Sequence, residues 1–510
     1  MSVFSSIYNW FVPKRIHRIH HSMNHPHDVQ QKWFHTLIAT AAQTEWGKRY
    51  GYSSIKHHSE FAERVPVSDY ESFKTHIARV RNGEQNVLWP SRINWFARSS
   101  GTTGDKSKFI PVSQESLKEC HYKGGIDLVA LYCHQHPESR FFNGKGLIMG
   151  GSLHVSNVNN LPYYEGDLSA VLIRNLPFYA DLLRVPSRSV ALMGEWESKI
   201  QKIAETTVHK KVTSLSGVPS WTLLLLKRML EMTGKSSIHE VWPDLEVFFH
   251  GGVNFLPYKA QFDKIIPPAQ MNYVETYNAS EGFFGIQDLP GNDSMLLMLD
   301  YGIFYEFCTP DQLDQEHPKV KTLDEVVPGE NYAMLISTNA GLWRYLIGDT
   351  IIFTSVNPYR IQISGRTKSF INAVGEELIV DNAEKAISIA CQRSHAVINE
   401  YTAAPVFFSD SENAAHEWLI EFDRPPDDMK EFCNQFDEAL KSLNSDYEAK
   451  RHQDMVLRLP IIRTVPPGTF YRWMKQKGKL GGQHKVPRLA NNRQFVEEIL
   501  RILEEKASAS

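Results

Sequence analysis

Short apolar, strand-like runs alternate with amphipathic helices along the first two thirds of this 510-residue chain. One such helix covers residues 221–232, where large apolar side chains recur at helical spacing. Each helix and each sheet must bury an apolar face against another element, so this alternation favours helices layered on a sheet. We therefore expect an α/β fold up to about residue 355. The clearest strand-like runs cover residues 146–149, 245–249, 295–299, 303–307 and 333–338.

The last third of the chain has a different order of elements. A helix through Arg393, capped by Asp381 or Asn382, precedes two expected strands, a second helix that starts at Pro425 and Pro426, and a further strand. This order predicts a separate, smaller α+β domain. The three expected strands cover residues 396–408, 417–422 and 456–463. We expect a large domain over residues 1–360, a hinge over 361–367 and a small domain over 368–510.

Composition narrows the class of protein. Lys and Arg total 55 against 58 Asp and Glu, so a net charge of −3 provides no overall field that attracts nucleic acid or an anionic membrane. No apolar run approaches the roughly 18 residues of a membrane-spanning helix, and the N-terminus lacks the order of a signal peptide. Five scattered cysteines form no CxxC pair, which argues against a disulfide framework and a cysteine zinc site. We expect a cytoplasmic protein with free thiols, no nucleic-acid partner and no integral membrane association.

The N-terminal residues predict a short amphipathic helix that ends at Pro13. Lys14 and Arg15 follow its apolar face, so the pattern suits either a basic membrane anchor or a helix docked on the body of the protein. Because the apolar stripe is short, docking is favoured. The apolar face comprises Val3, Phe4, Ile7, Trp10 and Phe11.

The most informative stretch is residues 99–108, which read Ser-Ser-Gly-Thr-Thr-Gly-Asp-Lys-Ser-Lys. This loop separates the apolar residues 93–97 from the strand-like residues 109–112. Glycines and small hydroxyl residues let backbone N–H groups approach a polyphosphate closely, and Lys106 and Lys108 add positive charge. The spacing is not that of a P-loop. The composition favours phosphate binding over an ordinary surface turn.

A second stretch, residues 277–282, places Tyr277 beside Glu281 and follows residues 249–253, an apolar run with paired glycines. An aromatic ring next to a lone acid suits a nucleotide base beside a metal ion, although such a pair in a loop is a weak signal.

The third stretch, residues 342–349, has Gly348 at the expected end of a strand and Asp349 in the turn that follows. A carboxylate there suits the two hydroxyls of a ribose, and the alternative is a turn aspartate that binds its own backbone. A fourth stretch covers residues 365–368, Gly-Arg-Thr-Lys, and is followed by Gly-Glu-Glu at 375–377.

These four stretches, in this order and with a late Gln-His-Lys-Val-Pro-Arg at residues 483–488, resemble the adenylate-forming superfamily. Within it they resemble the Gretchen Hagen family of auxin-responsive acyl-acid amido synthetases, in a compact, bacterial-type form. The resemblance covers about residues 29–493. Many adenylating enzymes share the first stretch, whereas residues 344–349 and 483–488 are more specific to the narrower family. The resemblance implies a large layered α/β N-terminal domain and a smaller α+β C-terminal domain.

The resemblance also implies roles for individual residues. Tyr277 would flank the adenine of ATP, Glu281 would coordinate Mg²⁺, and Asp349 would accept the ribose hydroxyls. Lys108 would hold the phosphates, and Lys485, on the small domain, would reach the reacting phosphate and carboxylate. The implied catalytic residues are Lys485, Glu281 and Lys108. The implied nucleotide-binding residues are Ser99, Ser100, Gly101, Thr102, Thr103, Gly251, Val253, Tyr277, Ser280, Asp349 and Arg366.

The charge pattern around Lys485 supports its role independently. Residues 463–493 contain eight Lys or Arg and no Asp or Glu, and three glycines make the segment around Lys485 flexible. The alternatives are a solvated run of charge and a nucleic-acid patch. The patch is disfavoured because only Tyr471 and Trp473 offer rings for base stacking.

The function implied by the resemblance is a two-step ligation. A carboxylic acid reacts with ATP to give an acyl adenylate, and the amine of an amino acid then takes the acyl group. An acyl-CoA or carrier-thiol ligase shares the first step and stays open as an alternative. A non-catalytic nucleotide-binding sensor or scaffold is disfavoured, because Glu281, Asp349 and Lys485 together would serve no purpose there. Four aromatic residues suit either an acyl pocket or the core, and composition favours the core: Tyr163, Tyr164, Phe178 and Tyr179.

Overall fold

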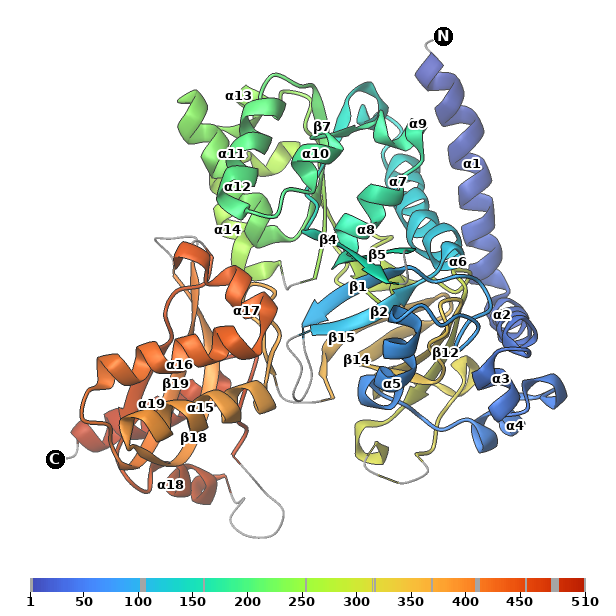
Figure 1. Ribbon diagram of the computed structural model, residues 1–510. Helices are drawn as coiled ribbons and strands as arrows, with labels where there is room; N and C mark the ends of the chain where they lie inside the picture. The colour runs from blue at the N-terminus through green and yellow to red at the C-terminus, as the bar shows by residue number, and fades with distance from the viewer. Residues whose placement is uncertain are drawn as a thin grey trace. The chain divides into compact units, whose positions relative to one another are not determined.

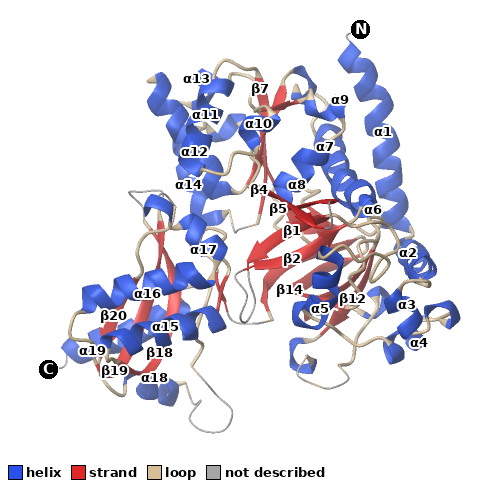
Figure 2. Cartoon of the chain, in the orientation of Figure 1, coloured by secondary structure: helices blue, strands red, loops and turns tan. Residues whose placement is uncertain are grey.

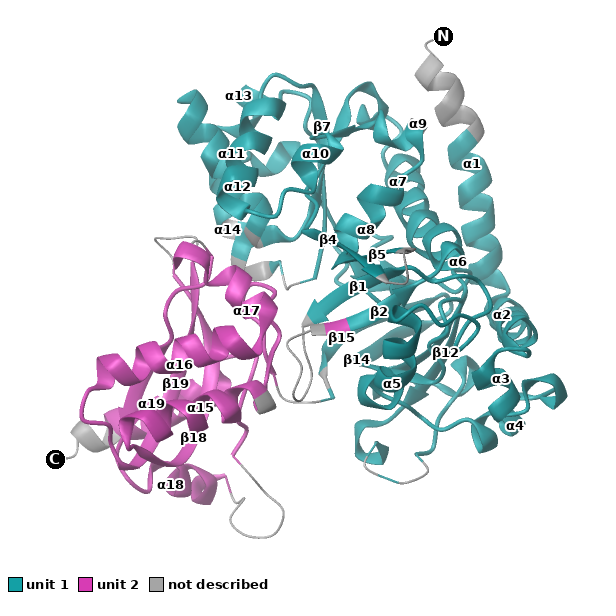
Figure 3. Ribbon diagram, in the orientation of Figure 1, with its two compact units in different colours: residues 1–99, 109–367 teal, residues 100–108, 368–510 magenta. Residues whose placement is uncertain are grey.

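The computed structural model describes most of the chain and divides it into two compact units (Figure 3). Unit 1 comprises residues 1–99 and 109–367, and unit 2 comprises residues 100–108 and 368–510. Both units combine helices and strands (Figure 2). The described residues are 3–100, 107–158, 161–252, 255–313, 315, 318–367, 370–408, 413–454, 456–477 and 486–508.

In the described part of the chain, unit 1 is built on an eleven-stranded sheet in the order β12-β13-β14-β15-β11-β10-β9-β8-β7-β3-β6. Strands β9, β8, β7, β3 and β6 pair in parallel, and the strands from β12 to β9 pair antiparallel. The five strand-like runs expected from the sequence are confirmed as β3, β8, β11, β12 and β13. The strands are β3 (Lys145–Ile148), β6 (Arg184–Val185), β7 (Val212–Gly217), β8 (Val247–Gly251), β9 (Asn272–Ala279), β10 (Gly282–Ile286), β11 (Met295–Leu297), β12 (Ile303–Cys308), β13 (Asn331–Thr338), β14 (Tyr345–Val356) and β15 (Tyr359–Arg366).

Helices cover both faces of the parallel strands, which confirms the layered α/β prediction. Helices α11 to α14 pack together on one side, and α7 packs with α1 on the other (Figure 1). The helices of unit 1 are α1 (Val3–Asn24), α2 (Pro26–Ala41), α3 (Glu45–Arg49), α4 (His58–Arg64), α5 (Tyr70–Arg81), α6 (Gln114–Ser116), α7 (Lys123–Gln135), α8 (Leu168–Asn175), α9 (Phe178–Asp181), α10 (Arg188–Ala191), α11 (Trp196–Thr207), α12 (Pro219–Thr233), α13 (Ile238–Val241) and α14 (Leu256–Ile265).

A second sheet has the order β2-β1-β5-β4. Strand β1 pairs in parallel with β5, and β5 pairs antiparallel with β4. The ring of Trp95 on β1 stacks on that of Tyr164 on β5, with centroids 4.1 Å apart, and this contact fixes the register of the pair. The four strands are β1 (Trp95–Ser100), β2 (Ser107–Val112), β4 (Leu153–Val158) and β5 (Leu161–Asp167).

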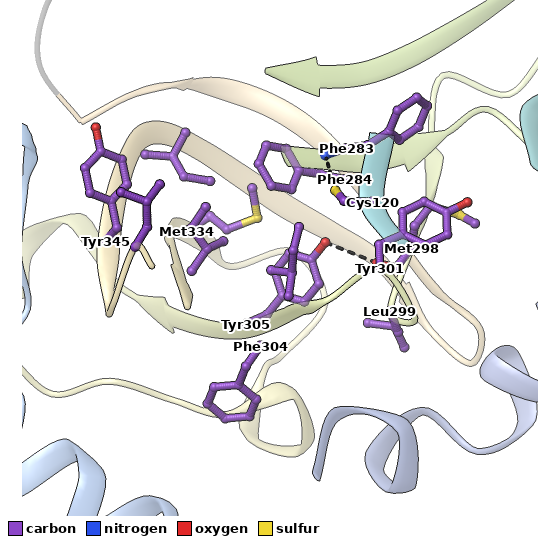
Figure 4. Close-up of a cluster of buried hydrophobic side chains, with 14 of the residues drawn as sticks. Cys120, Phe283, Phe284, Met298, Leu299, Tyr301, Phe304, Tyr305, Met334 and Tyr345 are labelled. Atoms are coloured by element: carbon purple, nitrogen blue, oxygen red, sulfur yellow. Dashed lines mark hydrogen bonds between the residues drawn. The ribbon is translucent and has the colours of Figure 1, made fainter. Parts of the chain in front are cut away.

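The main core of unit 1 lies against the antiparallel half of the large sheet (Figure 4). Phe284, Tyr305 and Met334 are fully buried there. The Tyr305 hydroxyl donates to the Met298 carbonyl at 3.1 Å, so the polar end of a core tyrosine is satisfied.

The N-terminal helix does not end at Pro13, as the sequence predicts, because α1 continues to Asn24. Beyond the proline, Ile16 and Ile19 are buried, and Arg15 Nε lies 2.6 Å from Asp127 Oδ1 on α7. This packing compensates for the backbone hydrogen bond that proline removes. The helix is docked on unit 1 through residues from Val12 onward. The side chains of Val3, Phe4, Ile7 and Trp10, which make up most of the expected apolar face, lie outside the described part of the chain. In the part of the chain that the structure describes, no helix is both long and apolar enough to cross a bilayer.

Unit 2 contains a three-stranded sheet, β18-β19-β20, in which β18 and β19 are antiparallel and β19 and β20 are parallel. Helices α15 and α16 pack on each other, as do α18 and α19. This arrangement confirms the small α+β unit. Its elements are β16 (Phe370–Ile371), β17 (Leu378–Ile379), α15 (Val380–Ser394), β18 (Val397–Phe407), β19 (Ala414–Arg424), α16 (Met429–Leu443), α17 (Ser445–Lys450), β20 (Ile461–Val465), α18 (Thr469–Gln476) and α19 (Gln494–Ser508).

Three boundaries in unit 2 differ from the prediction. Helix α16 begins after Pro425 and Pro426, because the Asp428 side chain caps it by accepting from two backbone N–H groups. Asn382 lies inside the first turn of α15 rather than before it, and its Oδ1 accepts from Ile379 N at 3.4 Å. The expected strand over residues 456–463 forms only from Ile461 onward.

A buried ion-pair network fixes α4 to the large sheet. Arg344 Nε donates to both carboxylate oxygens of Glu306 at 3.1 Å, and His58 Nε2 lies 2.8 Å from Glu306 Oε1. Arg344 also donates to the carbonyls of Ala62 and Val65 at 2.9 and 2.6 Å. Burial alone raises the pKa of Glu306, but Arg344 and His58 outweigh burial and hold this pKa below its usual value.

We expect Arg344→Met to destabilise unit 1 by about 3–5 kcal/mol, because Glu306 then stays buried without its main partner. Urea unfolding followed by tryptophan fluorescence measures this loss. The matched control is Arg140→Met, since Arg140 pairs with Asp244 on the surface at 3.3 Å and its loss should change stability by less than about 1 kcal/mol. Equal effects of the two substitutions would contradict the anchoring role.

The same network predicts a pH dependence. A carboxylate with a lowered folded pKa contributes its full stabilisation above its unfolded pKa of about 4.3, and this contribution is lost as pH falls through the folded value. The difference in unfolding free energy between the parent and Glu306→Gln should therefore be largest near pH 7 and shrink below about pH 4. A difference that is the same at both pH values would show that Glu306 is not the titrating group.

Candidate active site

The parallel strands of the large sheet bring several predicted residues to one edge. Because β3, β7, β8 and β9 are parallel, their carboxyl ends lie on the same side of the sheet. Ligands of open α/β sheets bind at this edge. Gly251 is the last residue of β8, and Tyr277 lies near the end of β9.

The end of β8 approaches β9 so closely that only glycine fits at position 251. A Cβ on Gly251 would lie 2.3 Å from the Thr276 carbonyl oxygen, and Gly252 adopts a φ of +82°. The Thr276 hydroxyl donates to the His250 carbonyl at 3.1 Å and holds the two strand ends together. Val253 lies outside the described residues. Glycine at position 251 therefore lets the end of β8 lie directly against β9, one residue before Tyr277.

Two of the four predicted stretches meet through a hydrogen bond. The Tyr277 hydroxyl donates to Asp349 Oδ2 at 2.6 Å, and both side chains are buried. Strands β10, β11 and β15 separate β9 from β14 in the sheet order, so the sheet must curve to bring these residues into contact. The ring of Tyr277 also packs edge-on against Phe284, with centroids 4.9 Å apart. The predicted adenine and ribose residues therefore form one cluster.

Asp349 is not in a turn at the end of a strand, as the sequence predicts, but inside β14. The register of β13 against β14 shifts between Ala333 and Leu335, and Gly348 has a φ of +100°. This irregularity is a β-bulge, which redirects a side chain without ending the strand. Thr367 N donates to the Gly348 carbonyl at 2.8 Å, so the fourth stretch supports the bulge from β15.

Arg366 lies opposite Asp349 in the register of β15 with β14, which places its backbone at the cluster. Its side chain lies outside the described part of the structure.

Ser280 and Glu281 form the two-residue turn between β9 and β10. Both are half-buried, and the turn starts three residues after Tyr277, directly after the same strand. Phe283 N donates to Cys120 Sγ at 3.2 Å, and the Phe283 ring packs so closely on Gly124 that a Cβ there would clash at 2.6 Å. These contacts hold the hairpin against Cys120 and α7, and Glu281 is a half-buried carboxylate in the turn of this hairpin.

The predicted phosphate loop is described only at its two ends. Ser99 lies on β1 and is half-buried, and the backbone of Ser100 ends that strand. Lys108 lies on β2 and is half-buried. Gly101, Thr102 and Thr103 lie outside the described residues, so the structure does not test their role.

Lys485 also lies outside the described residues. Several of the other cations in the basic segment form ion pairs within unit 2: Arg463 and Arg493 with Glu417, Lys477 with Glu498, and Arg488 with Glu400. These pairs neutralise four of the eight cations in the basic segment, which counts against the alternative of a solvated run of charge.

Glu376, from the Gly-Glu-Glu run, has a structural role. It is fully buried, its Oε1 lies 2.7 Å from His416 Nε2, and it accepts hydrogen bonds from Ala373 N and Val374 N. Burial alone raises its pKa, but these partners lower it below its usual value.

The aromatic residues considered for an acyl pocket do not converge. Tyr163 is buried in the core, Tyr164 stacks on Trp95, and Phe178 is 77% exposed. The side chain of Tyr179 lies outside the described part of the chain.

Two buried polar residues of unit 1 are not predicted from the sequence. His121, in a π-helical turn (Leu117–Tyr122), is buried. Burial lowers the pKa of His121 to about 4, so the ring is neutral. Lys199 is buried on α11. A signal for Lys199 was present, because it shares the apolar helical face of Ile200 and Ile203.

Proteins with assigned names match this chain along most of its length. Indole-3-acetic acid-amido synthetase GH3.4 of Arabidopsis thaliana is 24% identical over 550 residues, covering 91% of this chain and 89% of that protein. Indole-3-acetic acid-amido synthetase GH3.8 of Oryza sativa subsp. indica is also 24% identical, over 92% of this chain and 89% of that protein.

Two solved structures share the fold. The AtGH3.15 acyl acid amido synthetase in complex with 2,4-DB matches with a TM-score of 0.60 and 19% identity, over 93% of each chain. A 2-hydroxyisobutyryl-CoA ligase in complex with 2-HIB-AMP and CoA matches with a TM-score of 0.54 and 14% identity, over 98% of this chain and 94% of that one.

Family-level matches cover most of the chain. Residues 15–271 match the GH3 family N-terminal domain, residues 296–366 the GH3 family central domain and residues 381–494 the GH3 family C-terminal domain. Tyr277 and Glu281 lie between the N-terminal and central segments, and Asp349 lies within the central segment. The chain belongs to the GH3 family.

Proposed function

We propose that this protein is an ATP-dependent acyl-acid amido synthetase, which joins a small carboxylic acid to the amine of an amino acid. Members of the GH3 family are ATP-dependent acyl acid amido synthetases. The observation that carries the proposal for this chain is the contact of Tyr277 with Asp349, which joins two separate sequence stretches into one candidate nucleoside site.

In the first step, the carboxylate of the acid attacks the α-phosphorus of ATP. An acyl adenylate forms, and the bond to the β-phosphate breaks to release pyrophosphate. Asp349 accepts hydrogen bonds from the ribose, and the Tyr277 hydroxyl orients Asp349 for this task. Ser99 and Lys108, at the two ends of the phosphate loop, hold the triphosphate. Positioning and charge complementarity provide the catalysis.

The carboxylate of Glu281 fits a magnesium ion, because oxygen ligands from one or two carboxylates are typical of Mg²⁺ sites that also bind phosphate. When bound, Mg²⁺ neutralises phosphate charge.

In the second step, the amine of the amino acid attacks the acyl carbonyl. The new C–N bond forms as the C–O bond to AMP breaks, and the amine releases its proton to solvent. We propose that Lys485 balances the charge on the α-phosphate during the first step. We also place the hinge between the large domain (residues 1–360) and the small domain (residues 368–510) at residues 361–367.

A second candidate is an acyl-CoA ligase, which shares the first step and transfers the acyl group to a thiol. The similarity to the fold of the 2-hydroxyisobutyryl-CoA ligase keeps this candidate open. The curated relatives matched along the chain carry amido synthetase names, which favours the amine as the acceptor.

A pyrophosphate-release screen tests the proposal. Carboxylic acids, including indole-3-acetic acid, are tested with ATP and Mg²⁺, and each active acid is then combined with every amino acid or with CoA. Mass spectrometry of the products should show an acyl amide and AMP. A thioester in place of an amide would support the second candidate. No acid-dependent pyrophosphate release with any acid would contradict both.

We expect Glu281→Gln to reduce acid-dependent pyrophosphate release at limiting Mg²⁺ at least about 100-fold, because the amide is a poorer magnesium ligand and the phosphate charge stays unbalanced. Raising the Mg²⁺ concentration should restore part of the rate. The control is Glu63→Gln, at an exposed position on α4. Unchanged turnover of Glu281→Gln at limiting Mg²⁺ would remove this residue from the site.

We expect Asp349→Asn to raise the KM for ATP about 10- to 100-fold and to change the KM for the acid little, since a hydrogen bond to a charged acceptor is worth about 1.5–3 kcal/mol. Tyr277→Phe keeps the ring and should have a smaller effect in the same direction. With 2′,3′-dideoxy-ATP, the parent should be poor and the Asp349 variant no worse. A further loss with this analogue would show that Asp349 does not bind the ribose.

A further inference from the structure

Lys199 is a buried cation that the proposed mechanism does not use. Its side chain, on α11, is 1% exposed, and Nζ donates to the carbonyl oxygens of Gly150 and Gly151 at 2.5 and 3.1 Å. The ammonium also lies 4.6 Å from the ring centroid of Trp196 on the same helix. A cation in this position is thus bound by backbone carbonyls and an aromatic face.

The two glycines form a turn between β3, in the large sheet, and β4, in the second sheet. Side chains of other elements bind this turn from the opposite side. Ser152 N donates to Asp167 Oδ2 at 2.6 Å, and Gly151 N donates to the Ser169 hydroxyl at 2.9 Å. We call Lys199, Asp167 and Ser169 the turn clamp, because together they bind backbone groups on both sides of the turn.

The turn has no room for larger residues. A Cβ on Gly151 would lie 1.8 Å from Asp167 Oδ2, and one on Gly150 would lie 2.8 Å from the Ala191 carbonyl oxygen. The backbone of the turn is therefore pressed directly against the residues that bind it, and a shift of any member of the clamp must move the turn.

The turn clamp reaches two parts of the candidate site. Asp167 ends β5 and lies opposite Arg98 in the parallel register with β1, and Ser99 follows Arg98 where the predicted phosphate loop begins. The turn itself follows β3, whose carboxyl end lies on the same edge of the large sheet as Gly251 and Tyr277. The clamp thus connects the start of the loop to the sheet that carries the nucleoside cluster.

We propose that Lys199 is a positioning residue, which holds the Gly150–Gly151 turn so that Ser99 and the nucleoside cluster keep the spacing required for adenylation. This inference rests on the proposed function. Packing alone does not explain a lysine at this position, because a buried ammonium group loses its favourable free energy of hydration. Burial lowers the pKa of Lys199 to about 8, and the charge of Asp167 opposes this shift. A methionine of similar length would fill the same space without this cost, so the two carbonyl hydrogen bonds are the feature that lysine adds.

The test compares Lys199→Met with Lys202→Met, which changes an exposed lysine on the same helix. For Lys199→Met we expect kcat/KM for ATP in acid-dependent pyrophosphate release to fall about 100-fold, the effect of misplacing reacting groups by about 1 Å. Adenosine affinity, measured by calorimetry, should stay within twofold, because the nucleoside cluster is intact. Hydrogen exchange at Gly151 and Ser152 should accelerate. Lys202→Met should match the parent in all three measurements.

The outcomes separate the inference from the proposed function. If the parent releases no pyrophosphate with any acid, the proposed function fails. The inference is then tested by binding alone. It is supported if Lys199→Met loses affinity for ATP and keeps its affinity for adenosine. Loss of adenosine and ATP affinity together, or kcat/KM within twofold of the parent, would overturn it. If Lys199→Met does not fold, Asp167→Asn is tested instead. This substitution keeps the shape of the turn clamp and removes the negative charge of Asp167. The same criteria apply to it.

Discussion

The hydrogen bond from Tyr277 to Asp349 depends on the curvature of the large sheet, because three strands separate the two residues in the sheet order. The curved part of the sheet consists of the antiparallel strands from β9 to β14. The core residues Phe284 and Tyr305 pack together on this part of the sheet. The bulge at Gly348 then points Asp349 at the tyrosine. The candidate nucleoside site therefore exists only when the antiparallel half of unit 1 is complete.

Buried charges connect this sheet to the elements around it. Glu306, on β12, forms hydrogen bonds with Arg344 and His58. These bonds connect α4 to β12 and to the segment before β14. Glu376 and His416 play the corresponding part inside unit 2. Each pair is buried, so removing one partner leaves a charge without water, which is far more damaging than the loss of a surface pair.

The sequence predicted much of this architecture, because periodicity and motif order are local. Five of the eleven described strands of the large sheet, the small α+β unit and the residues of the Tyr277–Asp349 cluster were predicted. The helix through Pro13 was missed because tertiary packing of Ile16 and Ile19 overrides the local effect of proline. The bulge at Asp349 depends on neighbours far along the chain, whereas the helical face that Lys199 shares with Ile200 and Ile203 is a local signal. Glu306 carries no local signal at all, since its partners are more than 30 residues away.

The central claim is that Tyr277 and Asp349 form the nucleoside site of an adenylating enzyme. A crystal structure of the full chain with a non-hydrolysable ATP analogue tests it most directly. The account predicts adenine against the Tyr277 ring and both ribose hydroxyls within hydrogen-bond distance of Asp349, with the triphosphate running toward Ser99. Well-defined nucleotide density at any other place, with the Tyr277–Asp349 cluster empty, would contradict it.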